Sequence, residues 1–192
     1  MAEKSKAVFL DRDGTVILDA HYLSSPREIE FLPGAIEGIK KLNEAGWPVI
    51  IISNQSGVAR GIISEDMLQT IDKTMHKLLL AKGAHLDGAY YCPHHPEHGV
   101  YPYKDDCDCR KPSPGLLKQA AREHQLDLSR SYMIGDKPSD IEAGENAGTK
   151  TILVLTGLGA ESKNKLRKPA DFIASDLSAA ADWLLGRSAL EK

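Results

Sequence analysis

The feature of this sequence that most constrains its fold is the regular return of short apolar runs separated by amphipathic stretches. Each run is too short for a helix, and most are rich in Val, Ile or Tyr, as buried strands are. Strands are therefore expected over residues 7–10, 48–53, 88–92, 131–134, 151–155 and 171–173. Strands that alternate with helices form parallel sheets covered on both faces. The pattern predicts an α/β chain with a doubly wound parallel sheet.

Helix signals occupy the stretches between the expected strands. Helices are expected to start near Gly34, Ser64, Ser113, Pro138 and Asp176. In the helix that Ser64 caps, one apolar face is expected in the core. That face consists of Met67, Ile71, Met75 and Leu78. Ser113 is expected as an N-cap residue, with Pro114 at the first helical position.

The length and composition fit a single domain over residues 1–192. The chain has 192 residues, 42% of them hydrophobic, and a formal net charge of -3, so a full core can be built. No stretch between the first and third expected strands is long enough for a separate cap domain. We therefore expect an open site, covered only by small loops, on a monomer.

Charge and hydropathy argue against two classes of partner. Lys and Arg are scattered along a slightly acidic chain, which offers no basic stripe for a nucleic-acid backbone. The N-terminus is polar, and Asp11 interrupts the apolar run of residues 7–10, so neither a signal peptide nor a membrane span is expected there. Neither nucleic acid nor a membrane is expected as a partner, and the expected location is cytoplasmic.

Four polar clusters follow expected strands or precede an expected helix. They are Asp11-Arg12-Asp13, Ser53-Asn54, Arg110-Lys111 and Gly135-Asp136. The carboxyl ends of parallel strands share one edge of a sheet, so the clusters are expected to converge. Asp, Ser and Asn are also ordinary turn and cap residues, and any one cluster alone would mean little. Four clusters in this order indicate a functional site at the sheet edge.

With these motifs in order, the chain resembles the haloacid dehalogenase-type phosphatases. That family places Asp-x-Asp-Gly-Thr after its first strand, Ser or Thr after the second, Lys before a helix and Gly-Asp after a later strand. The matching positions are residues 11–15, Ser53, Lys111 and residues 135–136, within a match over about residues 7–155. The resemblance implies a Rossmann-like sheet and a magnesium-dependent phosphomonoesterase.

The resemblance also implies roles for the catalytic candidates. Asp11 would attack phosphorus and form an aspartyl phosphate. Asp13 would protonate the departing alkoxide and then activate the water that releases phosphate. Ser53 would hold phosphate oxygens, and Lys111 would neutralise the transferring group.

A magnesium site follows from the same resemblance. Mg²⁺ prefers oxygen ligands, which would be a carboxylate oxygen of Asp11, the backbone carbonyl of Asp13 and a carboxylate oxygen of Asp136. Asp140 lies one helical turn after Asp136 and is expected beside the site rather than in the ligand set. A sharp turn at Gly14 and a hydrogen bond from Thr15 would support the Asp11 loop.

All the cysteines fall in one Pro-rich segment that has few aliphatic residues. The segment has the pattern C-x-H-x₁₂-C-x-C, which offers two close pairs of ligands for tetrahedral Zn²⁺. The expected ligands are Cys92, His94, Cys107 and Cys109, with His95 and His98 as alternatives to His94. A complete ligand set implies a structural zinc that keeps a loop insertion, at about residues 92–109, ordered.

The loops also point to a substrate class. A zinc loop marks a branch of the resembled family that includes phosphatases of histidinol phosphate and of a heptose bisphosphate. The motifs around Ser53, Cys92 and Cys107 are similar to the second group, which implies a small sugar bisphosphate as substrate and leaves histidinol phosphate, or another sugar phosphate, as the alternative. The expected substrate contacts are Asp19, His21, Tyr22, Asn54, Gln55, Ser56, Arg110 and Lys137.

Two questions stay open at this level. Arg60 is either a surface residue or a contact to a distal phosphate, and the stretch after Gly157 has no diagnostic motif. A rival interpretation from another class is a zinc-loop binding module with an inactive carboxylate site. No catalytic position is lost, so an enzyme is favoured.

Overall fold

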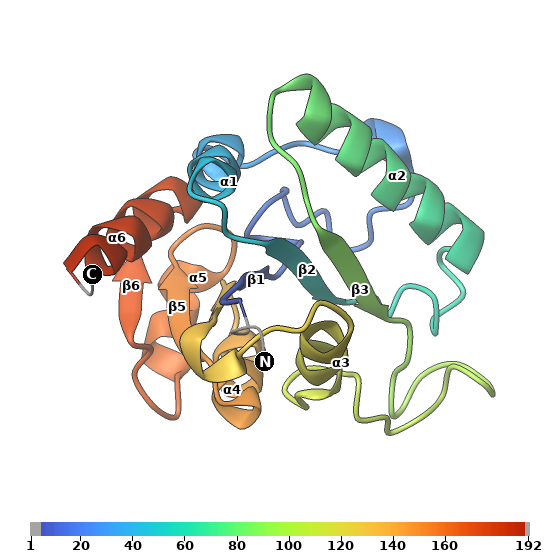
Figure 1. Cartoon of the computed structure of the whole chain (residues 1–192). Coiled ribbons are helices and arrows are strands. Elements are labelled where there is room, and N and C mark those ends of the chain that lie inside the picture. The colour runs from blue at the N-terminus through green and yellow to red at the C-terminus, as the bar shows by residue number, and fades with distance from the viewer. Residues whose placement is uncertain (1–4, 191–192) are drawn as a thin grey trace.

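Six parallel strands form one central sheet in the order β3-β2-β1-β4-β5-β6 (Figure 1). The computed structural model describes residues 5–190. The strands are β1 Val8–Leu10, β2 Val49–Asn54, β3 Gly88–Cys92, β4 Tyr132–Gly135, β5 Lys150–Val154 and β6 Phe172–Ala174. The chain starts at the middle of the sheet and winds outward first to one side and then to the other. The predicted Rossmann-like, doubly wound fold is confirmed.

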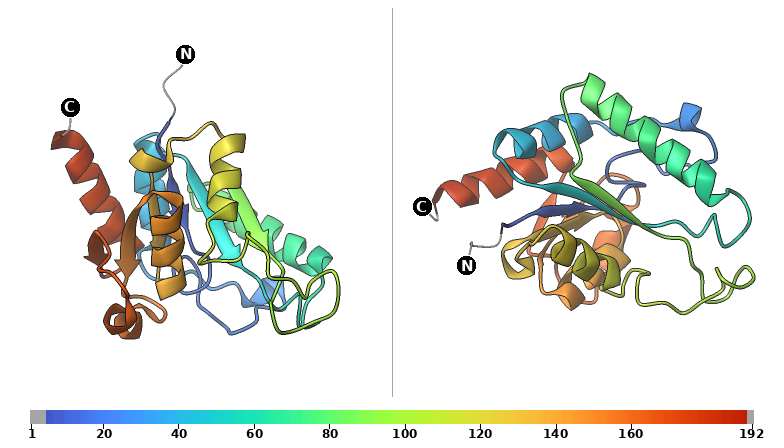
Figure 2. Two further views of the ribbon diagram at one scale, coloured as in Figure 1. Left: turned by 90° about the horizontal axis from the view of Figure 1, so that it is seen from below. Right: turned by 45° about the vertical axis from the view of Figure 1, so that its right-hand side comes forward.

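Helices cover both faces of this sheet (Figures 1 and 2). They are α1 Ala35–Glu44, α2 Glu65–Ala81, α3 Gly115–Glu123, α4 Pro138–Ala147, α5 Gly159–Ser162 and α6 Leu177–Leu190. Short 3₁₀ helices span Pro26–Glu28, Leu128–Arg130 and Lys163–Lys165. Helices α1, α2 and α6 lie on one face, and α3 and α4 lie on the other. Within residues 5–190, none of the helices combines the length and apolar character that a membrane span requires.

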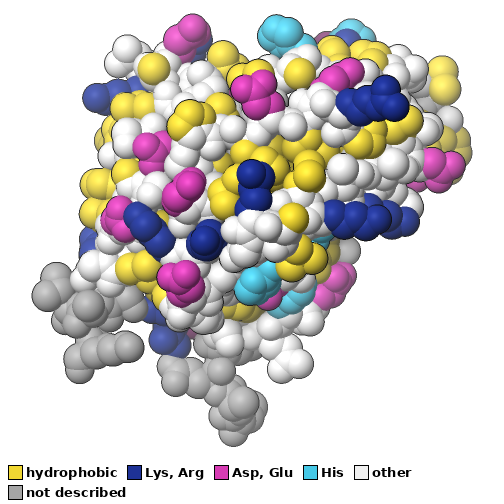
Figure 3. Space-filling view, turned by 90° about the horizontal axis from the view of Figure 1, so that it is seen from above, with side chains coloured by type: hydrophobic (Ala, Val, Ile, Leu, Met, Phe, Trp, Pro, Cys, Tyr) yellow, Lys and Arg dark blue, Asp and Glu magenta, His cyan; other side chains and the backbone are white. Residues whose placement is uncertain are grey.

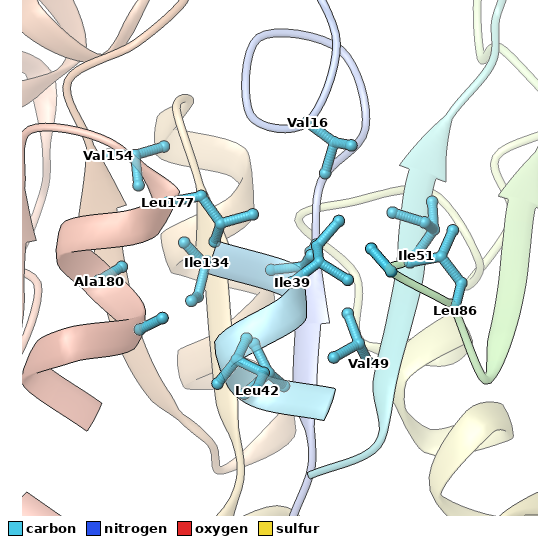
Figure 4. Close-up of a cluster of buried hydrophobic side chains, with 14 of the residues drawn as sticks. Val16, Ile39, Leu42, Val49, Ile51, Leu86, Ile134, Val154, Leu177 and Ala180 are labelled. Atoms are coloured by element: carbon cyan, nitrogen blue, oxygen red, sulfur yellow. The ribbon is translucent and has the colours of Figure 1, made fainter. Parts of the chain in front are cut away.

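The two helix layers produce two apolar cores because side chains of a strand alternate between its faces. Val8 and Leu10 of β1 pack on the side of α1, α2 and α6, whereas Phe9 packs on the side of α3 and α4. Figure 4 shows Ile39 of α1 and Leu177 of α6 among the labelled side chains that gather over the sheet. The strands that carry the polar clusters are thus held from both sides.

The buried face of α2 differs from the expected one. Met67 and Leu78 are each 36% exposed, whereas Leu68 and Leu79 are buried together with Ile71 and Met75. The positions in each set are apolar and recur every three or four residues, so both sets fit one face of a helix. Tertiary packing, which the sequence does not display, selects the second set. Ile71, Met75 and Leu79 join the core over the sheet, and Leu68 packs with Val58 and Ile63 of the loop after β2.

The start of α3 also differs by one residue. Pro114 is the N-cap residue and the helix begins at Gly115, so Ser113 does not cap it. The backbone N–H of Gly115 instead donates to the carbonyl of Asp108, at 2.9 Å. A carbonyl of the zinc-loop segment therefore takes the place that a serine side chain was expected to fill.

The loops that leave the carboxyl ends of β1, β2 and β3 gather at one edge of the sheet, the lower edge in the left view of Figure 2. Residues 11–34 and 55–64 form the first two loops, and neither contains a separate folded cap within the described chain. On the face shown in Figure 3, Lys and Arg side chains are interspersed with acidic and hydrophobic ones. Residues 11–34 and 55–64 thus cover the sheet edge with loops and the 3₁₀ helix Pro26–Glu28.

Candidate active site

The ends of β1 and β4 bring two carboxylates together at the sheet edge. Leu10 pairs with Ile134 in the sheet, and the N–H of Asp11 donates to the Ile134 carbonyl at 2.9 Å. Asp11 therefore follows directly on a fixed strand. Gly14 has a φ of 93° and lies against Asp136, where a Cβ atom would overlap the carboxylate. Only glycine allows this turn to approach Asp136 so closely.

Lys111 carries its ammonium group into the same cluster. Its Nζ donates to Asp11 Oδ1 at 2.7 Å and to the Ile52 carbonyl at 2.7 Å, and lies 2.7 Å from Asp140 Oδ1. Asn54 fixes the backbone of Lys111, because its amide accepts from Lys111 N at 2.9 Å and donates to Lys111 O at 3.0 Å. Both ends of the Asn54 amide thus hold the loop to β2.

The charges around Asp11 and Lys111 keep both side chains ionised. Burial opposes ionisation of Asp11, but the charges of Lys111 and Lys137 outweigh it and hold the pKa of Asp11 below its ordinary value. Burial likewise disfavours the Lys111 ammonium, but Asp11 and Asp140 outweigh it and raise the Lys111 pKa. At neutral pH the site therefore contains a buried carboxylate anion suited to act as a nucleophile.

Replacing Lys111 by Met is expected to destabilise the fold and to slow turnover. Two buried carboxylates would lose their cation, at a cost of about 3–5 kcal/mol in the free energy of unfolding. The variant would also lack the positive charge that is expected to neutralise the transferring phosphoryl group, which would lower kcat for phosphate-ester hydrolysis by roughly 10³-fold. Urea unfolding and steady-state kinetics measure both effects.

The matched control is Lys41→Met, because Lys41 pairs with Asp182 at the surface, at 2.6 Å. A surface pair contributes less than about 1 kcal/mol. Equal stability losses in the two variants would contradict the role assigned to the buried cation.

Three oxygens surround one position beside Asp11. The Nζ of Lys137 lies there, 3.2 Å from the Asp13 carbonyl, 3.9 Å from Asp11 Oδ2 and 4.0 Å from Asp136 Oδ1. Asp136 Oδ1 is buried and lacks a hydrogen-bond partner among residues 5–190. Ligand atoms of Asp11, Asp136 and Asp140 lie within 4.8 Å of one another. A hard divalent cation fits this all-oxygen set, and Asp136 Oδ1, which accepts no hydrogen bond from residues 5–190, is suited to be one of its ligands.

The loop after β5 supports this set of oxygens, a feature that the sequence analysis missed. The N–H of Leu158 donates to Asp136 Oδ2 at 2.8 Å, and the Thr156 hydroxyl donates to the Gly14 carbonyl at 2.8 Å. The only available signal was the run Thr156-Gly157-Leu158-Gly159 directly after a strand end. The stretch around Gly157, whose role was left open, therefore contributes to the site.

Magnesium is expected to stabilise the protein more at pH 8 than at pH 5.5. Burial, reinforced by Asp11 and opposed by Lys137, raises the pKa of Asp136 from 3.8 to about 7. A raised acid pKa means that the metal-free fold loses stability as pH rises from about 4 to 7. Below pH 7 a cation must also displace the proton on Asp136. The rise in Tm on adding Mg²⁺ should therefore be larger at the higher pH.

Differential scanning fluorimetry at both pH values makes this comparison. The Asp136→Asn variant is the control, because it cannot exchange that proton and should show no such pH difference. An equal rise in Tm at both pH values for the unaltered chain would contradict the interpretation.

A cavity of about 250 Å³ opens beside Asp13. Its lining includes every expected substrate contact, namely Asp19, His21, Tyr22, Asn54, Gln55, Ser56, Arg110 and Lys137. Lys137 Nζ donates to Asp19 Oδ2 at 3.0 Å, which links the loop after β1 to the start of α4. Ser53 is 1% exposed, and its hydroxyl accepts a hydrogen bond from Gln55 at 3.0 Å. The cavity therefore unites cations, amides and hydroxyls around the carboxylates.

The cysteine segment forms a four-ligand cluster. The three sulfur–sulfur distances are 3.0, 3.2 and 3.5 Å, and His94 Nδ1 lies 3.3 Å from Cys109 Sγ. Around a tetrahedral Zn²⁺ such edges measure about 3.8 Å, because each Zn–S bond is about 2.3 Å. The free thiols of Cys92, Cys107 and Cys109 and the ring of His94 fit one zinc ion, whereas His95 and His98 lie outside this cluster.

The cluster is coupled to the cations that follow it. Arg110 donates from Nη1 to the His94 carbonyl at 3.1 Å, and it lines the cavity. Lys111 is the next residue and reaches Asp11. Fixing the loop therefore also fixes two cations at the site.

Comparison with known proteins gives the family. A HAD-hydrolase-like family model matches residues 108–180. A curated relative from Yersinia pestis, named D-glycero-beta-D-manno-heptose-1,7-bisphosphate 7-phosphatase, is 40% identical over 96% of this chain and 92% of its own length. The chain belongs to this heptose-bisphosphate phosphatase family. A relative of the same name from Escherichia coli K12 is 40% identical over 96% of this chain and 91% of its own.

Solved structures of this heptose-bisphosphate phosphatase family agree with the fold. A D,D-heptose 1,7-bisphosphate phosphatase from B. bronchiseptica, complexed with magnesium and phosphate, has a TM-score of 0.86 and 36% identity over 95% of this chain and 99% of its own. The enzyme from Burkholderia thailandensis has a TM-score of 0.71 and 30% identity over 94% of this chain and 99% of its own. The resemblance to haloacid dehalogenase-type phosphatases is confirmed.

Proposed function

We propose that the chain is a magnesium-dependent phosphatase that hydrolyses the C7 phosphate of D-glycero-D-manno-heptose 1,7-bisphosphate. The products are heptose 1-phosphate and phosphate, in the route to ADP-heptose for the lipopolysaccharide core. One observation carries the proposal: the Asp11 carboxylate, paired with Lys111 at 2.7 Å, lies in a chain that is 40% identical over nearly its full length to phosphatases of that name.

The reaction begins at Asp11. Its carboxylate attacks phosphorus, the bond to the sugar oxygen breaks, and an aspartyl phosphate forms. Asp13 gives its proton to the departing alkoxide and then takes one from the attacking water. Lys111 and Ser53 hold the phosphate oxygens while the charge redistributes. The residues thus mainly cancel charge and fix geometry.

Magnesium is the proposed cofactor of this step. Asp11, the Asp13 carbonyl and Asp136 would hold it, and the ion would neutralise the phosphate oxygens and orient the reacting group. Asp140 is paired with Lys111 and accepts a hydrogen bond from Lys137 N at 3.0 Å, which fits a position beside the ligand set.

Zinc is proposed as a structural ion held by Cys92, His94, Cys107 and Cys109. Free thiols that hold a metal fit a reducing compartment, and a cytoplasmic location is proposed on that ground. A monomeric state stays a prediction.

For the second phosphate of the substrate, Arg110 and Lys137 are the cations that line the cavity.

A substrate panel tests the proposed function. With Mg²⁺ present, kcat/KM for heptose 1,7-bisphosphate is expected to exceed the value for histidinol phosphate by more than about 10²-fold. Histidinol phosphate has no second phosphate, so Arg110 and Lys137, the cations that line the cavity, would lack an anionic partner. Preference for histidinol phosphate would contradict the proposed substrate but would still support phosphatase activity. Absence of turnover with any phosphomonoester would favour the rival interpretation, a zinc-loop binding module.

A further inference from the structure

Arg12 is a buried arginine beside the reacting groups that the proposed mechanism leaves without a role. It stands between Asp11 and Asp13 in the chain and is 1% exposed, the largest fully buried side chain among the described residues. Burying a guanidinium is costly unless its surroundings compensate for the lost water. Its contacts therefore call for an explanation.

Nearly all of those contacts serve one carboxylate. Arg12 donates from Nε and Nη2 to Asp13 Oδ1, at 3.2 and 3.0 Å, and from Nη2 to Asp13 Oδ2 at 3.0 Å. Gln55 completes the arrangement, because its Nε2 donates to Asp13 Oδ2 at 2.7 Å and its Oε1 accepts from Arg12 at 2.9 Å. Both oxygens of Asp13 are thus acceptors, held by two side chains that also hold each other.

Arg12 is itself held from a second direction. Its guanidinium lies 5.7 Å from the centre of the Tyr91 ring, and the Tyr91 hydroxyl donates to Asp72 of α2. Its Nη1 nevertheless lacks a hydrogen-bond partner within residues 5–190. A buried ion pair with an unsatisfied donor is a poor device for stability, since an apolar replacement often serves the fold as well. The arrangement is better explained by what it does to Asp13.

We propose that Arg12, assisted by Gln55, is a positioning residue that holds the side chain of Asp13 in the orientation needed to hydrolyse the aspartyl phosphate. This inference rests on the proposed function, in which Asp13 moves the protons. In that step the water oxygen bonds to phosphorus, the bond from phosphorus to Asp11 breaks, and the water proton passes to Asp13. In the preceding step Asp13 gives a proton to the sugar oxygen and becomes the carboxylate that Arg12 receives.

The two half-reactions should therefore respond differently to the loss of Arg12. With p-nitrophenyl phosphate as the probe, the leaving group departs without protonation, so formation of the aspartyl phosphate needs no acid. Hydrolysis of the aspartyl phosphate still needs Asp13 as a base. Without the two-pronged contact from Arg12, Asp13 would be misplaced. With this probe only the second step would be slowed, because only that step needs Asp13.

The test compares Arg12→Met with Arg12→Lys, which keeps the charge and loses the two-pronged contact. Both are expected to lower kcat for p-nitrophenyl phosphate by about 10²-fold, as misplacement of a catalytic group does. KM should fall with kcat, and rapid quenching should find most of the enzyme phosphorylated on Asp11. A kcat within threefold of the unaltered enzyme, or a slow variant with no accumulated phosphoenzyme, would overturn the proposal.

Gln55→Leu covers the case in which Arg12 variants do not fold. It removes one donor to Asp13 and leaves the arginine in place, so a kcat reduced about tenfold with the same accumulation of phosphoenzyme is expected. Unchanged kinetics in Gln55→Leu would contradict the proposal. The matched control is Arg167→Met, because Arg167 is 83% exposed and lies 3.7 Å from Glu142. Its kinetics should be unaltered.

These outcomes are separable from failure of the proposed function. The p-nitrophenyl probe reports on the two half-reactions whatever the natural substrate is. If an Asp13→Asn variant that turns over this probe slowly carried no phosphate on Asp11, the aspartyl-phosphate mechanism itself would fail. If that variant accumulated phosphoenzyme and the Arg12 variants did not, only the positioning role would fail.

Discussion

Replacing Asp11 by Asn is expected to lower kcat by at least about 10⁴-fold, as removal of a catalytic nucleophile does. The amide has nearly the same size as the carboxylate, so the contacts with β4 and Lys111 can persist. It is a poor nucleophile and carries no charge for the cation site beside it. Initial rates with Mg²⁺, measured at matched enzyme purity, give the comparison.

Two controls make this result specific to the nucleophile. Asp182→Asn removes a carboxylate that is paired with Lys41 at the surface, and should leave kcat unaltered. The Asp11→Asn protein should also keep its zinc and an unfolding transition close to that of the unaltered chain. A kcat within tenfold of the unaltered value would contradict nucleophilic attack by Asp11.

Replacing Cys107 by Ser is expected to release zinc and to lower both Tm and kcat. Residues 93–114 contain neither a helix nor a named strand in the described structure, so metal ligation would be a main cross-link within them, besides the attachment of Lys111 to Asn54. Without it, Arg110 would lose its fixed position at the His94 carbonyl, whereas Lys111 would keep its contact with Asn54, and kcat should fall by about 10²-fold. Elemental analysis, calorimetry and steady-state kinetics measure the three effects.

His98→Ala is the matched control, because His98 lies in the same loop but outside the four-ligand cluster. That variant should retain one zinc per chain and nearly full activity. If Cys107→Ser kept its zinc and its Tm, the zinc proposal would be wrong. If it lost the zinc but kept full activity, the coupling between loop and site would be wrong.

Much of the site could be predicted from the sequence because strand ends are recognisable. Asp11, Ser53 and Asp136 each come at or directly after the end of an apolar run, and parallel strands deliver such positions to one edge. The hydrophobic runs also gave strand boundaries within one or two residues of those observed. Both results depend on local sequence together with a general rule of parallel sheets.

The remainder depends on packing that local sequence does not encode. Nothing in the motif says that Arg12 turns inward onto Asp13 or that Tyr91 backs it. The carboxylate of Asp140 could have faced a metal, but its ion pair with Lys111 comes from a loop far along the chain. Likewise, packing with Val58 and Ile63 of the loop after β2 decides that Leu68 rather than Met67 is buried in α2.

The structure also clarifies how the cysteine segment is connected to the carboxylate site. Arg110 is bound to the carbonyl of the expected ligand His94, and Lys111 is clamped on both sides by Asn54 of β2. The loop is therefore attached to the sheet at one end and to the Cys/His cluster at the other. This double attachment explains how an irregular segment can place a buried lysine against Asp11.

Phosphorus NMR of the reaction with heptose 1,7-bisphosphate shows which phosphate is released, because the two phosphates of the substrate have distinct resonances. With purified protein and Mg²⁺, we expect loss of the C7 phosphate signal, growth of inorganic phosphate in equal amount, and persistence of the C1 phosphate signal. Release of the C1 phosphate, or no release from a protein that retains its zinc and is supplied with Mg²⁺, would contradict the proposed function.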